Sequence, residues 1–356
     1  MRGSRMLLLA GLVVLLVGGR LVWALGTSRP AARPAVPSAA SASAAAQTPP
    51  AASASTATAS AAPSATPTAS AAPSASPPAA LPLTGFQRRG GASWTTPAEE
   101  TRYLDRLARL SSRVRVIVVG TTRRGRPIRL VVAGPARSAA QIRAGRSALV
   151  VCSQHGDEPA AREACLQRVR TLASGGGDDT VLLIPTANPD GVAAGTRANS
   201  SGVDVNRTHR TLGTAESRAI ASVLAEYRPD VLNDLHEYRT EGARRVLTRG
   251  DSSYGGLVSA AIRRLSVELT HRWQERAIQA GGYATAPYSD AVLLAGLVEN
   301  AAEKHVVAGL TETPRRGRLD RRQRVDAQRR SIDGTLQMLR ERGSALAAAT
   351  VRAGRR

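Results

Sequence analysis

Residues 147–164 read SALVVCSQHGDEPAAREA, and this stretch decides which fold the chain is expected to adopt. Its first six residues are short and apolar, a pattern typical of a buried strand. Pro159 and the alanines after it are typical of the first turn of a helix. His155 and Glu158 are therefore predicted on a strand-to-helix turn. In open α/β sheets such turns, at the carboxyl ends of strands, bind ligands.

A second stretch, residues 228–236, reads RPDVLNDLH and has the same organisation, with an apolar strand that ends at His236. Catalytic zinc sites usually take three protein ligands from His and Asp/Glu and keep a fourth position for water. A His-x-x-Glu pair by itself is often an ordinary solvated pair. Together with His236, however, His155 and Glu158 complete the ligand count. The sequence therefore predicts a zinc site of the kind found in metallohydrolases.

Further motifs occur in a fixed order along the chain. They are VIVVG at 116–120, GRPI at 125–128, NPDG at 188–191, RANSSGVDVNR at 197–207 and LTETP at 310–314. With the two stretches above, they resemble the zinc metallocarboxypeptidase family of the carboxypeptidase A type, and are nearest to the bacterial murein-peptide amidases that carry His-Gly-Asp-Glu. The resemblance covers roughly residues 95 to 340. It implies an α/β/α sandwich around a twisted mixed sheet of about eight strands.

The resemblance also implies the chemistry of the site. His155, Glu158 and His236 would bind one zinc ion per chain. Glu312 would be the general base, which takes a proton from the zinc-activated water and passes it to the leaving amine. The implied reaction is the hydrolysis of a peptide bond next to a free carboxyl end.

Four more residues receive roles by the same resemblance. Arg197 would stabilise the tetrahedral oxyanion. Asn206 and Arg207 would hold the terminal carboxylate of the substrate, a task that suits the planar fork of a guanidinium. For the tyrosine that closes over the substrate in this family, the chain offers Tyr254, Tyr283 and Tyr288 without a clear motif, and Tyr288 is our choice among them. The chain departs from the family where an aromatic residue is expected after Arg207, since Thr208 and His209 follow instead. We interpret His209 as a polar residue near the cleft.

The first 26 residues have the layout of an export signal. Arg2 and Arg5 precede an apolar run over residues 6–17. The apolar stretch continues to Leu25 with only Arg20 interrupting it, which is long enough for a short membrane anchor. Residues 1–26 are therefore predicted to be a signal peptide or an N-terminal membrane anchor. The protein is expected to be exported, either anchored at the outer face of the cytoplasmic membrane or secreted to the cell wall.

Residues 27–84 consist almost wholly of Ala, Ser, Pro and Thr, and no charged residue lies between Pro34 and Gly85. Such a composition cannot bury a core, so this segment is predicted to be a disordered tether. Residues 85–356 are enough for one large α/β domain, which would be the zinc carboxypeptidase-like catalytic domain.

The formal net charge is +22, and almost all of the positive charge comes from arginine. A strongly basic exported domain is attracted to anionic membranes and wall polymers over a Debye length of about 8 Å. Nucleic-acid binding is not expected, because aromatic residues make up only 3% of the chain and no recognition motif is present. We expect a monomer. The cysteines, Cys152 and Cys165, could form a disulfide in an exported protein or pack as buried thiols.

Three functions fit these observations. The first is an exported zinc peptidase, with wall stem peptides as the preferred peptide or muropeptide substrate because of the leader, the tether and the His-Gly-Asp-Glu motif. The second is a zinc-dependent deacylase of N-acyl amino acids, which would share the ligand and Asn-Arg motifs. The third is an inactive wall-binding module, which would be expected to lack a ligand or the base, whereas this chain keeps all four residues.

Overall fold

The computed structural model describes residues 80–136, 138–175, 177–250, 257–288 and 295–352. The predicted leader, and the predicted tether up to residue 79, lie outside the described residues. Among the described residues no helix is both long and apolar enough to cross a membrane.

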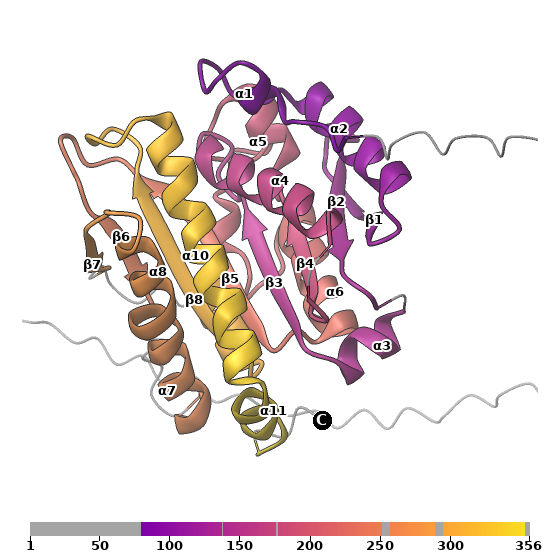
Figure 1. Ribbon diagram of the computed structural model, residues 1–356, viewed down its shortest axis with the longest axis vertical. Helices are drawn as coiled ribbons and strands as arrows, with labels where there is room; N and C mark the ends of the chain where they lie inside the picture. Colours follow the sequence, from indigo (N-terminus) through magenta and orange to yellow (C-terminus); the bar gives the residue numbers. More distant parts are fainter. Residues whose placement is uncertain (1–79, 137, 176, 251–256, 289–294, 353–356) are drawn as a thin grey trace, which may run out of the picture. The chain divides into compact units, whose positions relative to one another are not determined.

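One eight-stranded sheet forms the centre of the domain, in the order β1-β2-β4-β3-β5-β8-β6-β7 (Figure 1). The four central strands β4, β3, β5 and β8 are parallel to one another. Antiparallel pairs join β1 to β2, β2 to β4 and β6 to β8, so the sheet is mixed, as predicted. The strands are β1 (Val114–Thr121), β2 (Pro127–Ala133), β3 (Ser147–Cys152), β4 (Thr180–Ile184), β5 (Val231–Tyr238), β6 (Val246–Arg249), β7 (Thr285–Pro287) and β8 (Val307–Pro314).

Helices cover both faces of this sheet. Side chains that alternate along the central strands enter two separate cores, because successive residues of a strand point to opposite faces. Val150 belongs to the core that includes residues of α2, α4 and α10, and its neighbour Val151 belongs to the core that includes residues of α6 and α9. The helices are α1 (Gly85–Arg88), α2 (Pro97–Leu110), α3 (Ala139–Ala144), α4 (Pro159–Ala173), α5 (Pro189–Ala194), α6 (Ala215–Tyr227), α7 (Ala260–Glu268), the π-helix η2 (Leu269–Gln274), α8 (Glu275–Gln279), α9 (Leu297–Glu303), α10 (Arg321–Glu341) and α11 (Gly343–Arg352).

Local sequence explains where the main helices start. Thr96 caps α2 with its hydroxyl and Pro97 takes the first helical position, where a missing N–H costs nothing. Asp320 caps α10 in the same way, within a capping box completed by Gln323. The long α10 can therefore begin directly after the loop that follows β8, close to the carboxyl edge of the sheet.

The domain includes a few residues that the sequence analysis assigned to the tether. Thr84 is fully buried, and its hydroxyl donates to the buried carboxylate of Glu163 on α4. The Thr95 hydroxyl donates to the same carboxylate at 2.6 Å. Arg170 on α4 donates to the backbone oxygen of Leu81 at 3.3 Å. The segment that enters the domain is thus held on α4 from Leu81 onward.

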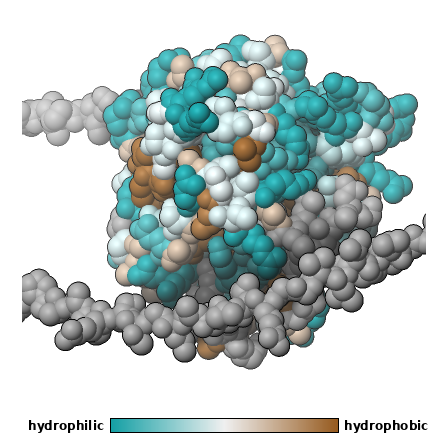
Figure 2. Space-filling view, turned by 180° about the vertical axis from the view of Figure 1, so that it is seen from behind, coloured by the Kyte–Doolittle hydropathy of each residue, from teal (hydrophilic) through white to brown (hydrophobic). Residues whose placement is uncertain are grey.

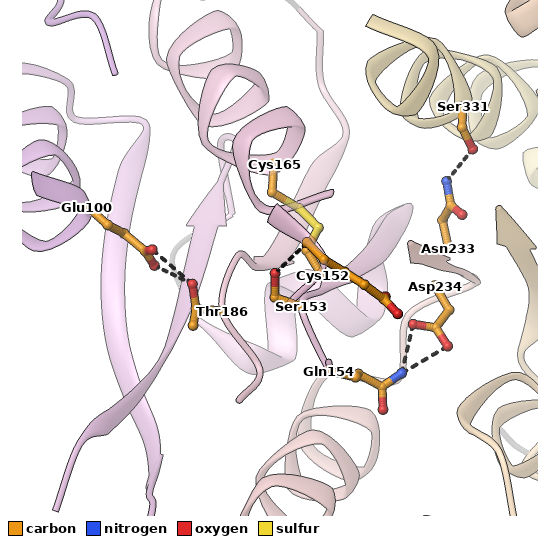
Figure 3. The surroundings of a disulfide bond; sticks show 10 residues. Glu100, Cys152, Ser153, Gln154, Cys165, Thr186, Asn233, Asp234 and Ser331 are labelled. Atoms are coloured by element: carbon orange, nitrogen blue, oxygen red, sulfur yellow. Dashed lines mark hydrogen bonds between the residues drawn. A yellow bond between two sulfur atoms is a disulfide. The ribbon is translucent and has the colours of Figure 1, made fainter. Parts of the chain in front are cut away.

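A disulfide joins Cys152, the last residue of β3, to Cys165 on α4 (Figure 3). The structure thereby decides between the two states that the sequence left open. The bond closes a loop with a sequence separation of 13 residues, and this loop contains His155 and Glu158. Viewed from the opposite side to Figure 1, the described surface is mostly hydrophilic, with hydrophobic residues in small separate patches (Figure 2).

Candidate metal centre and active site

The structure brings the three predicted ligands together at the carboxyl edge of the sheet. His155 and Glu158 lie on the turn between β3 and α4, as predicted. His236 lies within β5, two residues before the strand ends, where the sequence pattern had predicted the strand to stop. Since β3 pairs with β5 and Cys152 lies opposite Leu235, the turn after β3 reaches the side chain of His236.

The three side chains face one another and are buried. Nδ1 of His155 is 2.7 Å from one oxygen of Glu158, and Nδ1 of His236 is 2.9 Å from the other. The two Nδ1 atoms are only 3.1 Å apart. Two imidazole nitrogens at this distance need a proton or a cation between them. The His155, Glu158 and His236 group is therefore one that could hold a metal ion.

The donor set also suits zinc in its chemistry, because two imidazole nitrogens and a carboxylate are ligands that catalytic zinc takes. Burial would raise the pKa of Glu158, but the neighbouring charges of His155 and His236 outweigh it and hold this pKa well below its usual value. Glu158 is therefore an ionised carboxylate, as a zinc ligand must be.

Each histidine is oriented by a second carboxylate. Nε2 of His155 is 3.1 Å from Oδ1 of Asp204, and Nε2 of His236 is 3.1 Å from Oδ2 of Asp234. A carboxylate at Nε2 keeps the proton on that nitrogen and leaves Nδ1 free to bind a metal. Both histidines thus present the same nitrogen to the centre of the group.

Glu312 lies on β8 beside the ligands. It pairs in register with His236 on the parallel neighbour β5, so the two side chains lie on the same face of the sheet. Burial raises the pKa of Glu312 to about 7, although the nearby charge of His236 lowers it. A partly exposed carboxylate with this pKa exchanges protons near neutral pH, as a general base must.

Arg197 also reaches the group formed by His155, Glu158 and His236. Its Nη1 is 3.2 Å from Nδ1 of His155 and 3.4 Å from the Glu158 carboxylate. Its Nε and Nη2 donate to Asp204 at 3.1 and 3.0 Å, which fixes the plane of the guanidinium. The side chain is 44% exposed, so it faces both the ligands and the solvent.

Asn206 and Arg207 lie on the short 3-10 helix η1 (Val205–Arg207) and differ in their surroundings. Asn206 is buried, and its side-chain oxygen accepts from the backbone N–H of Leu297 at the start of α9, at 2.8 Å. Its amide nitrogen is 3.2 Å from Nε2 of His236. Arg207 is exposed, and its Nη1 donates to the Asn206 backbone oxygen at 3.0 Å. Arg207 is thus the more accessible member of the predicted carboxylate clamp.

The sequence analysis missed a buried polar network behind His236. Gln154 donates to both oxygens of Asp234, at 2.8 and 2.9 Å, and accepts from Nε2 of His209 at 2.6 Å (Figure 3 shows Gln154 and Asp234). Burial lowers the pKa of His209 to about 4, so its ring is neutral and can serve as the donor. One signal was available, because alternate strand residues share a face and Asp234 therefore lies on the same face as His236.

Tyr288 follows β7 directly and is partly buried. Its backbone N–H donates to the oxygen of Thr248 on β6 at 2.9 Å. Residues 289–294, next to it, are outside the described part of the chain. The lid role of Tyr288 stays a prediction.

Comparison with known proteins agrees with this geometry. Residues 100–240 match a family model described as zinc carboxypeptidase. A probable carboxypeptidase 2 of Trichophyton verrucosum is 30% identical over 149 residues, which cover 38% of this chain and 29% of that protein. The chain therefore spans less than a third of the length of this curated relative. The resemblance to the zinc carboxypeptidase family is confirmed over this segment, whereas the nearer likeness to murein-peptide amidases stays a prediction.

Solved structures share the fold. A metallo-carboxypeptidase from Burkholderia cenocepacia superposes with a TM-score of 0.54 at 16% identity, covering 68% of this chain and 69% of that one. A carboxypeptidase A from Helicoverpa armigera gives a TM-score of 0.57 at 17% identity, covering 72% and 74%. The predicted α/β fold around an eight-stranded mixed sheet is thus confirmed.

Proposed function

Because residues 100–240 match the zinc carboxypeptidase family, we propose that this protein is a zinc-dependent peptidase that cleaves the peptide bond next to a free carboxyl end. The observation that carries the proposal is the buried group of His155, Glu158 and His236, with Glu312 opposite His236. Zinc held by these ligands would polarise the substrate carbonyl and lower the pKa of water.

Glu312 is proposed to move the proton in this reaction. Its carboxylate takes a proton from the attacking water and delivers it to the nitrogen of the leaving amine. A pKa near 7 suits both halves of that transfer, because the group gives up and accepts a proton with little cost at neutral pH. Arg197, held by Asp204 beside the ligands, supplies positive charge where the oxyanion develops.

Arg207 and Asn206 are proposed to recognise the carboxyl end of the substrate. The exposed guanidinium of Arg207 can donate two N–H bonds to a carboxylate. The side-chain oxygen of Asn206 accepts from the backbone N–H of Leu297, and this hydrogen bond anchors the backbone next to Arg207. A substrate without a terminal carboxylate would lose the contact with Arg207.

We also propose that the enzyme is exported and acts on peptides of the cell wall. The charged and apolar leader, the tether over residues 27–84 and the His-Gly-Asp-Glu motif support this proposal. The basic charge of the domain favours residence near anionic membranes or wall polymers.

The decisive experiment compares peptides that differ only at the carboxyl end. The zinc-loaded domain is incubated with muropeptides and ordinary peptides, each with a free or an amidated end, and the products are identified by mass. Free ends should be cleaved at least roughly tenfold faster, the scale of one charge-assisted contact. Arg207→Ala should narrow this gap, and Arg197→Ala should slow both series alike.

Equal cleavage of free and amidated ends by the parent protein would overturn the carboxypeptidase proposal. N-acyl amino acids are incubated with the same domain in a parallel arm. Release of their acyl group, with no cleavage of either peptide series, would establish the deacylase alternative instead. The muropeptide arm separately tests the wall substrate, because ordinary peptides should then be the poorer substrates.

A further inference from the structure

Two loops that carry six arginines border the metal centre. Residues 239–245, which follow β5, read RTEGARR, and residues 315–318, which follow β8, read RRGR. The first loop begins three residues after His236, and the second begins three residues after Glu312. His236 and Glu312 are paired on neighbouring strands, so the two loops start side by side. We call this surface the arginine rim, formed by Arg239, Arg244, Arg245, Arg315, Arg316 and Arg318.

Backbone hydrogen bonds connect the two loops. The N–H of Gly242 donates to the oxygen of Arg316 at 3.3 Å, and the N–H of Arg318 donates to the oxygen of Ala243 at 2.8 Å. Gly317 packs so closely that a Cβ atom there would lie 2.1 Å from the Ala243 oxygen. The rim is therefore a single built surface rather than two independent loops.

The rim is also fastened to the metal-binding turn. Arg315 contacts the carboxylate of Asp157 at 2.6 Å, and Arg239 contacts the same carboxylate. Asp157 immediately precedes the candidate ligand Glu158, so the residue that contacts the rim is next in sequence to a residue of the candidate metal centre. Arg316 lies 3.1 Å from Glu241, the one acidic residue within the two loops.

The positive charge of the rim remains accessible. Among the residues that the structure describes, two carboxylates, Asp157 and Glu241, form ion pairs with the six guanidinium groups of the rim. The side chains of Arg239 and Arg316 are 54% and 59% exposed. Arg244, Arg245 and Arg318 are exposed as well.

The rim and the proposed carboxylate clamp lie on opposite sides of the ligands. Asn206 bonds to the start of α9, and α9 packs on the same face of the sheet as α6. Asp157 precedes α4, and Arg324 of α10 donates to the Arg315 backbone oxygen at 3.3 Å. Helices α4 and α10 pack on the other face. A peptide whose carboxyl end is held at Arg207 would therefore extend across the metal centre toward the rim.

We propose that the arginine rim binds carboxylates on the part of the substrate upstream of the scissile bond, so that the enzyme prefers acidic peptides. This inference rests on the proposed function, because it places the substrate by its clamped carboxyl end. A guanidinium pairs with a carboxylate through two parallel N–H bonds. One exposed ion pair contributes up to about fivefold in affinity, so three such pairs would give a preference of roughly tenfold or more.

The test uses two peptides with the same carboxyl-terminal dipeptide, preceded by three Glu or by three Gln. The parent should show a kcat/KM at least about tenfold higher for the Glu peptide, and the ratio should shrink in 0.5 M salt, a concentration chosen to be about three times the physiological level. A variant with Arg239→Gln, Arg244→Gln and Arg245→Gln should bring the ratio to within about threefold. A matched control removes three exposed arginines of α2 and should keep the preference: Arg102→Gln, Arg106→Gln and Arg109→Gln.

Three results would overturn the inference: equal kcat/KM for both peptides, a preference that salt does not reduce, or the same loss of preference in the α2 control. These outcomes leave the proposed function intact, because both peptides are still cleaved at the carboxyl end. If neither peptide is cleaved, the proposed function fails. The affinity of the parent for labelled forms of the same two peptides is then measured by fluorescence anisotropy. Equal affinity for the Glu and Gln peptides would contradict the proposed role of the rim.

Discussion

At the scale of single residues, the site depends on charges that are buried next to each other. Glu158 would be costly to ionise in isolation, yet it lies between two imidazoles that keep its pKa low. Asp204 and Asp234 complete the arrangement from the outer side of each ring. Three carboxylates thus hold the two imidazole rings in place, and the two Nδ1 atoms, 3.1 Å apart, face each other where a cation could bind.

The first residue-scale prediction separates metal binding from catalysis. Glu312→Gln should keep about one zinc per chain and lose turnover by at least about a hundredfold, because it removes the proton acceptor and none of the three ligands. His236→Ala should instead lose zinc, since two ligands hold the ion poorly. Metal analysis and kcat measured on the same samples check both. Near-normal turnover in Glu312→Gln would remove the general-base role.

The pH profile gives a second test of the same carboxylate. A general base must be ionised, so kcat/KM should fall as the pH drops through the pKa of Glu312. Burial raises this pKa to about 7, and the charge of bound zinc moves the midpoint lower. The acidic limb should therefore lie at or below pH 7 in the parent, and the residual activity of Glu312→Gln should lack it. A profile unchanged by the substitution would assign the limb to another group.

At the scale of elements, the β3–α4 unit is held at both ends of its turn. Backbone pairing fixes β3 between β4 and β5, and the disulfide ties the end of β3 to α4. The turn between them carries His155 and Glu158, so the geometry of two ligands depends on a short cross-linked loop. Backbone pairing also explains why β5 extends beyond its expected end at His236, because β8 continues to pair with it as far as Tyr238.

Removing this cross-link should lower stability and loosen the site. We expect Cys152→Ala with Cys165→Ala to reduce the free energy of unfolding by about 3 kcal/mol, the usual scale for a loop of this length. Zinc affinity should fall as well, because two ligands then sit on a less constrained turn. Urea unfolding and chelator competition measure the two effects, and the reduced parent provides the control. A loss below about 1 kcal/mol with unchanged zinc affinity would contradict the prediction.

At the scale of the whole molecule, zinc should stabilise the folded domain. The ligands come from two distant parts of the chain and meet only when β3 and β5 pair, so the unfolded chain offers no such site. Zinc at a hundred times its dissociation constant should add about 2.7 kcal/mol, which raises Tm by at least roughly 5 °C in a domain of this size. Calorimetry with and without chelator checks this, with His236→Ala as the control. An equal shift in that variant would place the zinc elsewhere.

The sequence by itself determined the local pieces. The strand over residues 147–152 and the helix that starts at Pro159 follow from the hydrophobic pattern and the position of the proline. The His-x-x-Glu spacing indicated that His155 and Glu158 lie together, and all of these patterns are short-range signals. The residue types also favour zinc as the metal. The order of the motifs indicated the family and with it the mixed sheet.

Only the tertiary structure decided which distant groups meet. The network of His209, Gln154 and Asp234 joins three separate segments, and the disulfide requires α4 to pack back on β3. The arginine rim likewise exists because β5 and β8 are neighbours in the sheet. In the sequence, 75 residues lie between Arg239 and Arg315, where the loop after β8 begins. In a chain so rich in arginine, composition cannot distinguish these side chains from the others. Strand pairing distinguishes them, because it brings the ends of parallel strands to one edge of the sheet, beside the metal ligands.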